Sequence, residues 1–387
     1  MSTTDLNQLD DETFRLRFRE WLAAHYPKKW TRSTERPFLR FHGPELREWF
    51  KTLNEHGWRL PDWPKQYGGL ELSFRKQLIY IQELNRAGVG RIVDNGGTQL
   101  GPTIMKYGTD AQKAFHLPRI LTGEHMWAQG YSEPNAGSDL ASLKTKAELN
   151  DDHFLVNGQK IWTTFAQEAD YIYMLVRTGQ FEKKQQGISF LLIDLKTPGI
   201  TIRPILNIAG ETELCEVFFD DVKVPAENLV GELHQGWAIA KSLLGHERIW
   251  LGDPTMCISA MSLCKSLLAS TGKNADPVVM AEFAQLNADL HDYQSLYADI
   301  CDEVAETNKI GPEASMLKVF SSELLQRITE FNVRLGDEFA LASGDINIDD
   351  TQTNLPWQLM MSRPTTIYAG CNEVQRDILA ANLGLTR

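Results

Sequence analysis

Residues 131–139 read YSEPNAGSD, and residues 157–164 read NGQKIWTT. Pro134 and Gly137 are typical of a turn, and Trp162 brings a flat apolar face that can cover one side of a ring system. Hydroxyl groups that can both donate and accept hydrogen bonds occur in both stretches, at Ser132, Ser138, Thr163 and Thr164. Either stretch alone also fits a polar hairpin with a core tryptophan. Their occurrence together, in this order, favours a binding site over that alternative.

Length and composition define the class of protein. The chain has 387 residues, of which 42% are hydrophobic and 23% charged. This length predicts two or three modules that share a continuous core, and the composition is that of a globular protein. The net charge is -12, and no dense basic run occurs, so we expect no nucleic-acid surface.

The cysteines and the N-terminus indicate the compartment. The five cysteines form no C-x-x-C pair and are odd in number, so they predict neither a zinc site nor a disulfide framework, and no metal is expected. Residues 1–11 are polar and acidic without an apolar signal core, and no stretch approaches the roughly 18 apolar residues of a membrane span. We therefore expect a cytoplasmic protein without a membrane span.

The period of the hydrophobic pattern changes twice along the chain. Apolar residues recur at helical spacing from residue 10 to about residue 123. From about residue 127 to residue 230 the pattern consists of short runs of branched and aromatic residues that predict strands. Helical periodicity then returns in four stretches, which predict a helical bundle, near residues 236–271, 277–309, 312–342 and 363–382.

The two opening stretches resemble the flavin-binding segments of the acyl-CoA dehydrogenase family. Further resemblance, over nearly the whole chain, lies in WPKQYGG at 63–69, YGT at 107–109 with LP at 117–118, DDVKVP at 220–225 with LVGE at 229–232, and IYAGCNEVQR at 367–376. The resemblance implies an α+β fold with three domains. These are an N-terminal α-helical domain (1–125), a central β-barrel-like domain (126–232) and a C-terminal four-helix bundle (233–387).

The family resemblance also implies the reaction, which is FAD-dependent α,β-dehydrogenation of an acyl-CoA thioester to the trans-2-enoyl-CoA. A base removes the α-proton while the flavin N5 takes a hydride from the β-carbon. The base is a carboxylate whose pKa is raised by a dry pocket, and preorganised donors stabilise the enolate-like oxygen. Electron-transfer flavoprotein is the electron acceptor that the resemblance implies.

By the same match, site residues can be assigned one by one. The FAD contacts are expected at Gln129, Tyr131, Ser132, Gly137, Ser138, Trp162, Thr163, Thr164, Cys371 and Glu373. Ser138, Arg248 and Ala369 are matched to substrate binding. Arg248 would face the CoA portion or steady the carboxylate region, and the backbone N–H of Ala369 would help to bind the thioester carbonyl.

The catalytic base is the main departure from the common family pattern. Many members carry a glutamate directly after the tyrosine of the C-terminal loop, where this chain has Ala369. A minority carry the carboxylate on the first bundle helix, immediately before an arginine. Glu247 precedes Arg248 at that place, so we predict that Glu247 is the base. The alternative is a surface Glu–Arg pair. His246 points some 100° away from Glu247 on a helix and receives no role.

Further departures concern contacts with a neighbouring subunit. Many homotetrameric members carry Arg-x-x-Phe-Gly after the first bundle helix, where this chain reads LLASTGK at 267–273. A Gln-x-x-Gly-Gly-x-Gly segment is not recognisable in 331–350, and Cys371 replaces the usual threonine. We therefore expect a tetramer, of α2β2 type with a second acyl-CoA dehydrogenase-like chain, as in steroid side-chain and some dicarboxylate-degrading members.

The substrate and two other functions are left open by the sequence. Gly96, Gly97 and Gly101, and a predicted helix break at 252–254, fit a pocket widened for a bulky steroid side-chain acyl group, and they fit ordinary packing equally well. The alternatives to a dehydrogenase are an oxygen-using oxidase or monooxygenase of the same fold, and a non-catalytic or half-site subunit of a heteromer.

Overall fold

The computed structural model describes residues 5–27, 40–88, 91–92, 94–307, 309–342, 344–348 and 351–385. The side chains at 40, 41, 91, 244–251 and 351 lie outside the described part. The chain forms two compact units. The first comprises residues 1–41, 72–92 and 248–387, and the second comprises residues 42–71 and 93–247.

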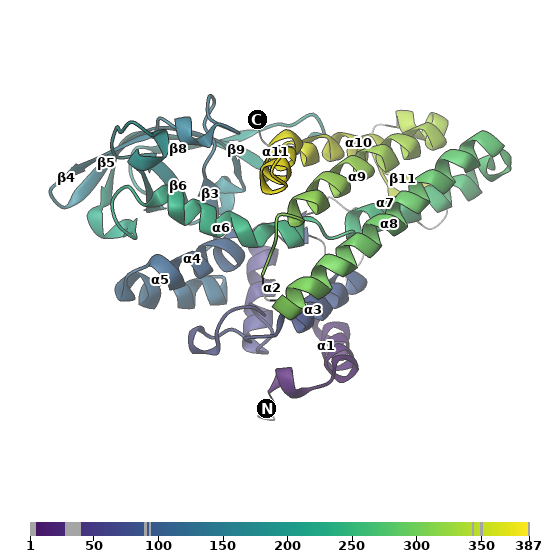
Figure 1. Ribbon diagram of the computed structural model, residues 1–387, viewed down its shortest axis with the longest axis horizontal. Coiled ribbons are helices and arrows are strands. Elements are labelled where there is room, and N and C mark those ends of the chain that lie inside the picture. The colour runs from purple at the N-terminus through teal and green to yellow at the C-terminus, as the bar shows by residue number, and fades with distance from the viewer. Residues whose placement is uncertain are drawn as a thin grey trace. The chain divides into compact units, whose positions relative to one another are not determined.

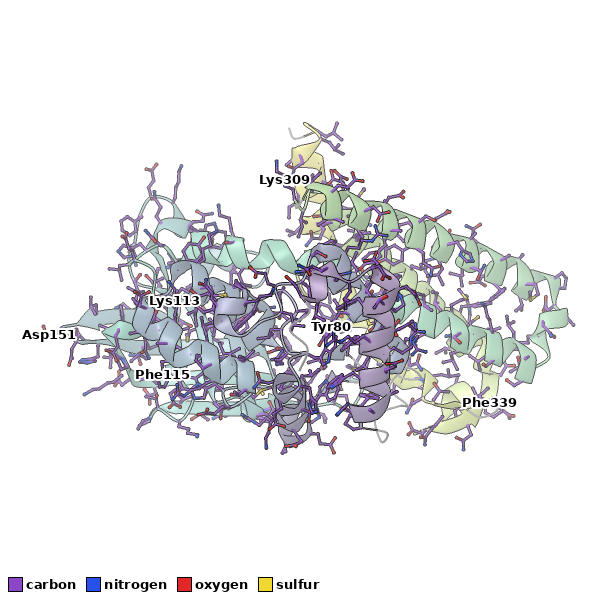
Figure 2. The ribbon with its side chains drawn as sticks, turned by 90° about the horizontal axis from the view of Figure 1, so that it is seen from below. Tyr80, Lys113, Phe115, Asp151, Lys309 and Phe339 are labelled. Carbon is purple, nitrogen blue, oxygen red and sulfur yellow. The ribbon has the colours of Figure 1, made fainter. Side chains whose placement is uncertain are left out.

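Two helices begin the first unit. Helix α1 (Asp11–His25) starts at Asp10, whose side chain accepts a hydrogen bond from the Thr13 N–H, the usual N-cap arrangement. Its buried stripe packs against α3 (Phe74–Ala87), where Phe18 stacks on Tyr80 with ring centroids 4.3 Å apart. Tyr80 is labelled in Figure 2. The predicted spacing of apolar residues in these segments is confirmed.

The remainder of the first unit is a helical assembly centred on one helix. Helix α9 (Ala314–Gly336) contacts four other helices, which are α7 (Thr255–Ser270), α8 (Pro277–Thr307), α10 (Leu355–Ser362) and α11 (Asn372–Asn382). Figure 1 shows the long helices α8 and α9 side by side. A hairpin of β11 (Ile346–Ile348) and β12 (Thr351–Thr353) lies between α9 and α10 in the sequence.

The second unit is built on an eight-stranded sheet. Its strand order is β10-β7-β6-β4-β5-β9-β8, with β3 paired to β6. The strands are β3 (Trp127–Gly130), β4 (Lys146–Asn150), β5 (His153–Thr164), β6 (Tyr171–Arg177), β7 (Ile188–Asp194), β8 (Ile200–Ile205), β9 (Leu214–Pro225) and β10 (Leu229–Val230). Asp151, at the β4–β5 turn, marks one end of this sheet in Figure 2.

Both faces of the central strands are buried. Ile172 and Met174 of β6 belong to a core enclosed by the strands, whereas Tyr173 and Leu175 face a second core that includes residues of the helices. Successive strand residues point to opposite faces, so burial on both sides explains the unbroken apolar run in this strand. Helices of this unit include α2 (Gly43–Glu55), the π-helix η4 (Asn95–Leu100), α4 (Gly101–Tyr107), α5 (Asp110–Thr122) and the greater part of α6 (Gly236–Leu251).

The structure confirms the helical, β and helical order and corrects the C-terminal details. Helix α6 (Gly236–Leu251) ends before Gly252, and α7 begins at Thr255, so the predicted break at 252–254 is present. The predicted helix over 363–382 is wrong in its first half. Residues 363–366 form a 3-10 turn, and Ala369 and Gly370 have φ values of 55° and 81°. This left-handed backbone cannot continue a helix.

The region after α9 also differs from the prediction. The helix predicted to run to residue 342 ends at Gly336, because Asp337 has a φ of 46°. The β11–β12 hairpin and the short helix α10 were also missed, since three-residue strands and an eight-residue helix carry little periodicity. Among the described helices, none combines the length and apolarity that a membrane crossing requires.

Candidate active site

The 131–139 stretch forms the predicted turn. Glu133 and Ala136 exchange two backbone hydrogen bonds of 3.0 Å each, which places Pro134 and Asn135 at the tip. Gly137 and Ser138 follow on the exposed side of the loop. A Cβ atom added at Gly137 would meet no atom within 4 Å. The turn therefore leaves Ser138 and the backbone around it accessible to a ligand.

The end of β5 carries Trp162 in an unusual conformation. The register against β9 shifts between Lys160 and Thr163, and Trp162 has a φ of 60°. Left-handed backbone at a non-glycine residue stores strain, and such strain gathers at functional sites. The Trp162 side chain is 55% exposed, whereas a tryptophan of a folded core would be buried. The alternative of a core tryptophan is therefore excluded for this residue.

Thr163 and Thr164 follow Trp162 with different environments. Thr163 is 1% exposed, and its Oγ1 has no hydrogen-bond partner among the described residues. A buried hydroxyl without a partner is costly, so this atom fits a hydrogen bond to a bound molecule. Thr164 is half-buried and lines a small pocket together with Trp127 and Phe165.

The two stretches lie together at the end of the sheet. The Ile161 N–H donates to the Ser132 carbonyl oxygen at 3.0 Å. The Lys160 ammonium contacts the Glu133 carboxylate at 2.8 Å. Six predicted flavin residues, Ser132, Gly137, Ser138, Trp162, Thr163 and Thr164, are thus carried by neighbouring segments of the second unit.

The side chains of Gln129 and Tyr131, two further predicted flavin residues, contact other side chains of the protein. The Gln129 amide donates to Gln99 Oε1 at 3.0 Å and to the Tyr173 hydroxyl at 3.2 Å. Tyr131 is 6% exposed and packs edge-on against Tyr173. Both side chains therefore help to build the core beneath the loop, and their contact with a cofactor stays a prediction.

The loop after the 3-10 helix η11 (Arg363–Thr366) carries the predicted C-terminal site residues. Ala369 is exposed, and its carbonyl oxygen accepts a hydrogen bond from Gln375 Nε2 at 3.1 Å. Within the described part of the chain, no hydrogen bond from the Ala369 N–H is present. Cys371 is half-buried at the start of α11, and Glu373 is exposed in its first turn. Hydrogen bonds from its own backbone N–H and from Cys371 hold the pKa of Glu373 below its usual range.

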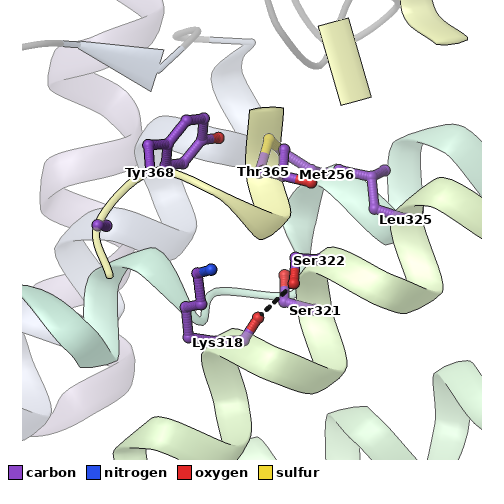
Figure 3. Close-up of a pocket in the computed structure, with 8 residues that line it drawn as sticks. Met256, Lys318, Ser321, Ser322, Leu325, Thr365 and Tyr368 are labelled. Carbon is purple, nitrogen blue, oxygen red and sulfur yellow. Dashed lines mark hydrogen bonds between the residues drawn. The ribbon is translucent and has the colours of Figure 1, made fainter. Parts of the chain in front are cut away.

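A small pocket adjoins this loop within the first unit. Its lining consists of Met256, Lys318, Ser321, Ser322, Leu325, Thr365, Tyr368 and Ala369. Figure 3 shows Lys318 rising from α9 toward the loop that carries Tyr368. Lys318 is 4% exposed, and its ammonium donates to Asn372 Oδ1 at 2.7 Å. Burial lowers the pKa of Lys318 to about 8, against the opposing effect of nearby Cys371 and acidic residues.

The burial of Lys318 was not predicted from the sequence, although the helical spacing of the residues around it indicates it. Residues 314, 318, 321, 325 and 328 of α9 are all buried, at the spacing of one helical face. A lysine on that face is a buried amine that must find a partner. Asn372 supplies the partner and links α9 to the first residue of α11.

Glu247 and Arg248 belong to helix α6 by their backbone. Their side chains lie outside the described residues, so the predicted base and the predicted CoA contact stay predictions.

Three matches cover most of the sequence. Residues 9–124 match the acyl-CoA dehydrogenase N-terminal domain, residues 128–222 the middle domain, and residues 234–384 the C-terminal domain. Acyl-CoA dehydrogenase IpdE1 of Mycobacterium tuberculosis is 33% identical, with 98% of each chain covered. The chain belongs to the acyl-CoA dehydrogenase family.

Other relatives and solved structures agree with this assignment. Acyl-CoA dehydrogenase FadE26 of Mycobacterium tuberculosis is 35% identical over 89% of each chain. The structure named Tcur3481-Tcur3483 steroid ACAD superposes with a TM-score of 0.85 at 29% identity, covering 99% of this chain and 100% of the other. The ChsE4-ChsE5 complex from Mycobacterium tuberculosis superposes with a TM-score of 0.82 at 31% identity, and both chains are fully covered.

The predicted fold class and the predicted enzyme class are confirmed. The protein is an acyl-CoA dehydrogenase with an N-terminal helical domain, a central β domain and a C-terminal helical domain. Members of this family generally use FAD. The residues present fit such a cofactor, because two neighbouring segments carry the exposed Trp162, the open loop at Gly137 and a Thr163 hydroxyl that has no hydrogen-bond partner among the described residues.

Proposed function

We propose that this acyl-CoA dehydrogenase uses FAD to form a trans-2-enoyl-CoA, with Glu247 as the base. The observation that carries the assignment of the base is Ala369. The family's common base position is occupied by a methyl group on an exposed left-handed residue, so it offers no proton acceptor. Glu247 on α6 is the carboxylate that the minority family pattern places before an arginine.

Each residue then has a defined task. Glu247 takes the α-proton onto its carboxylate, and the backbone N–H of Ala369 donates to the thioester oxygen, where negative charge develops. Trp162, Thr163 and Ser132 would hold the flavin ring, the first by an apolar contact and the other two by hydrogen bonds to its polar edge. The bound flavin supplies the acceptor for the β-hydride. Ser138 and Arg248 contact the substrate.

We also propose a second chain of the same family as partner. Two similar structures, by their names, are complexes of two chains, ChsE4-ChsE5 and Tcur3481-Tcur3483. This sequence lacks the Arg-x-x-Phe-Gly and glycine-rich segments that serve a neighbouring subunit's cofactor. An α2β2 tetramer would contain fewer FAD molecules than chains. A ratio of one FAD per chain in protein purified alone would contradict this part of the proposal.

The proposed substrate is a bulky acyl-CoA derived from a steroid side chain, and the proposed electron acceptor is electron-transfer flavoprotein. The name of one similar structure, steroid ACAD, supports the substrate class. Peroxide production without an added acceptor would instead favour the oxidase alternative.

Anaerobic reduction of the flavin by acyl-CoAs tests the proposal. Native protein, alone and with candidate partner chains, should lose its flavin absorbance at about 450 nm when bulky acyl-CoAs are added. Glu247→Gln should retain FAD and slow the bleaching roughly 10²–10⁴-fold, the usual contribution of a general base. Glu306→Gln, an exposed change on α8, is the control. Unchanged bleaching in Glu247→Gln would move the base elsewhere.

A further inference from the structure

A fully buried ion pair lies between the two flavin-associated stretches. Lys160 of β5 is 0% exposed, and Glu133 of the 131–139 turn is 8% exposed. The Lys160 ammonium donates to Glu133 Oε1 at 2.8 Å and to the Tyr131 carbonyl oxygen at 3.2 Å. A single side chain from β5 thus holds both the first and the third residue of the turn.

The carboxylate of this pair has further partners. Glu133 Oε2 accepts from the Lys144 N–H at 2.6 Å, and Oε1 accepts from the Thr145 N–H at 2.8 Å. Burial opposes ionisation of Glu133, but the Lys160 charge and these hydrogen bonds outweigh it and hold its pKa below the usual range. Both oxygens are satisfied, so one group ties the turn to β5 and to the two residues that precede β4.

A buried ion pair is weak evidence for a contribution to stability. The cost of removing two charges from water is about as large as their attraction, and apolar replacements of similar volume are often as stable. The pair therefore needs another explanation, and its location offers one. Lys160 immediately precedes the register shift that gives Trp162 its left-handed backbone, and Glu133 immediately follows Ser132.

We propose that the Glu133–Lys160 ion pair positions the cofactor-binding surface of this enzyme. It fixes the 131–139 turn against the end of β5, so that Ser132, Trp162 and Thr163 already have their binding arrangement before FAD arrives. Preorganisation of this kind raises affinity because the ordering cost is not incurred on binding. Glu133 and Lys160 are positioning residues, and their role rests on the proposed use of FAD.

FAD affinity and unfolding stability, measured separately, test this role. The variants are Lys160→Met, Glu133→Gln and the double variant Lys160→Met/Glu133→Leu, each in the full chain with any partner that native protein needs for FAD binding. Each single change leaves one buried polar group without its partner and should lower both stability and FAD affinity. The double change removes both charges and should regain most of the stability, while FAD affinity stays at least 10-fold below native.

A matched control separates positioning from general destabilisation. Gln112 is 7% exposed and ties α5 to the carbonyl oxygens of Glu227 and Leu229 at 2.7 and 2.9 Å. Gln112→Leu should lower the stability of the same unit without changing FAD affinity by more than about twofold. The visible circular dichroism of bound flavin gives a second readout, because it reports the surroundings of the ring. It should change in the double variant and stay native in Gln112→Leu.

The possible results distinguish a failure of the positioning role from a failure of the proposed use of FAD. Native FAD affinity and native visible circular dichroism in the double variant would overturn the positioning role while leaving the use of FAD intact. An equal loss of affinity in Gln112→Leu would also overturn it, because the effect would then follow from destabilisation alone. If native protein binds no FAD with any partner, the proposed function fails and the positioning role fails with it.

Discussion

Replacement of Gly101 by alanine would decide between packing and a widened acyl pocket. Gly101 is the first residue of α4, and an added Cβ would lie 2.0 Å from Trp63 Cζ2. The Trp63 ring cannot retreat easily, because it is 1% exposed and its Nε1 donates to the Gly97 carbonyl oxygen at 2.7 Å. The space above Gly101 is therefore occupied by the indole, which favours packing.

The expected loss follows from this geometry. Overpacking of a core costs about 1–3 kcal/mol, and the better helix propensity of alanine returns up to about 1 kcal/mol. The backbone at Gly101, with φ of -55° and ψ of -55°, accepts alanine without strain. We expect a net loss of about 1–2 kcal/mol, which corresponds to a fall in Tm of roughly 2–8 °C in a unit of this size.

Thermal unfolding, combined with a second substitution, tests this prediction. Trp63→Phe removes the ring atoms that the new Cβ would meet, so the double variant should be more stable than the sum of the two single losses predicts. Gly137→Ala, where a Cβ would meet nothing within 4 Å, is the control for stability. An unchanged Tm in Gly101→Ala, together with altered rates for bulky against short acyl-CoAs, would refute the packing interpretation.

Two pH-dependent predictions come from buried basic groups. Burial lowers the pKa of Lys318 from 10.5 to about 8. Between these pH values the unfolded chain binds one more proton at this residue than the folded chain does, so the contribution of Lys318 to the free energy of unfolding increases as pH rises. The stability of Lys318→Met relative to native should therefore decline from pH 8 to pH 10.5 in urea unfolding, and a constant difference would contradict this. Burial, then the charges of His125 and Arg119, lower the pKa of His116 from 6.5 to about 4, so native protein should lose stability as pH falls through this interval. In His116→Phe, which can keep the edge contacts to Trp127, the loss of Tm between about pH 7.5 and about pH 5 should be smaller, and an equal loss would assign acid sensitivity to other groups.

The sequence predicted the second unit better than the end of the first. Unbroken runs of branched, aromatic and other apolar residues in β6 and β7 gave strong strand signals, and both strands are present. The hydrophobic periodicity wrongly predicted one helix over 363–382, because apolar residues continue at helical spacing through the loop that precedes α11. Ala369 adopts a φ of 55° there, and an alanine gives no local sign of a left-handed backbone. Pro364 and Gly370, the latter with a φ of 81°, were the local signs against a continuous helix, and the periodicity outweighed them.

The glycines near residue 100 are a second feature for which the sequence allowed two interpretations and the long-range contacts favour one. Their clustering was visible in the sequence, but packing and a widened pocket predicted the same residues. The positions of Trp63 and Leu60, the latter 2.4 Å from a Cβ added at Gly97, show that neighbouring side chains occupy this space. Only long-range contacts carry that information, because residues 60 and 63 are far from residues 97 and 101 in the chain.

The order of helical and β segments, the turn at 131–139 and the absence of a carboxylate at Ala369 could all be predicted from the sequence. These are properties of local residue types and of their spacing. The burial of Lys160 and Lys318, and their pairing with Glu133 and Asn372, depend on contacts between distant parts of the chain. A charged lysine side chain is normally exposed to solvent, because burial removes its hydration. It becomes buried where the fold brings a hydrogen-bonding or ionic partner close to the ammonium group.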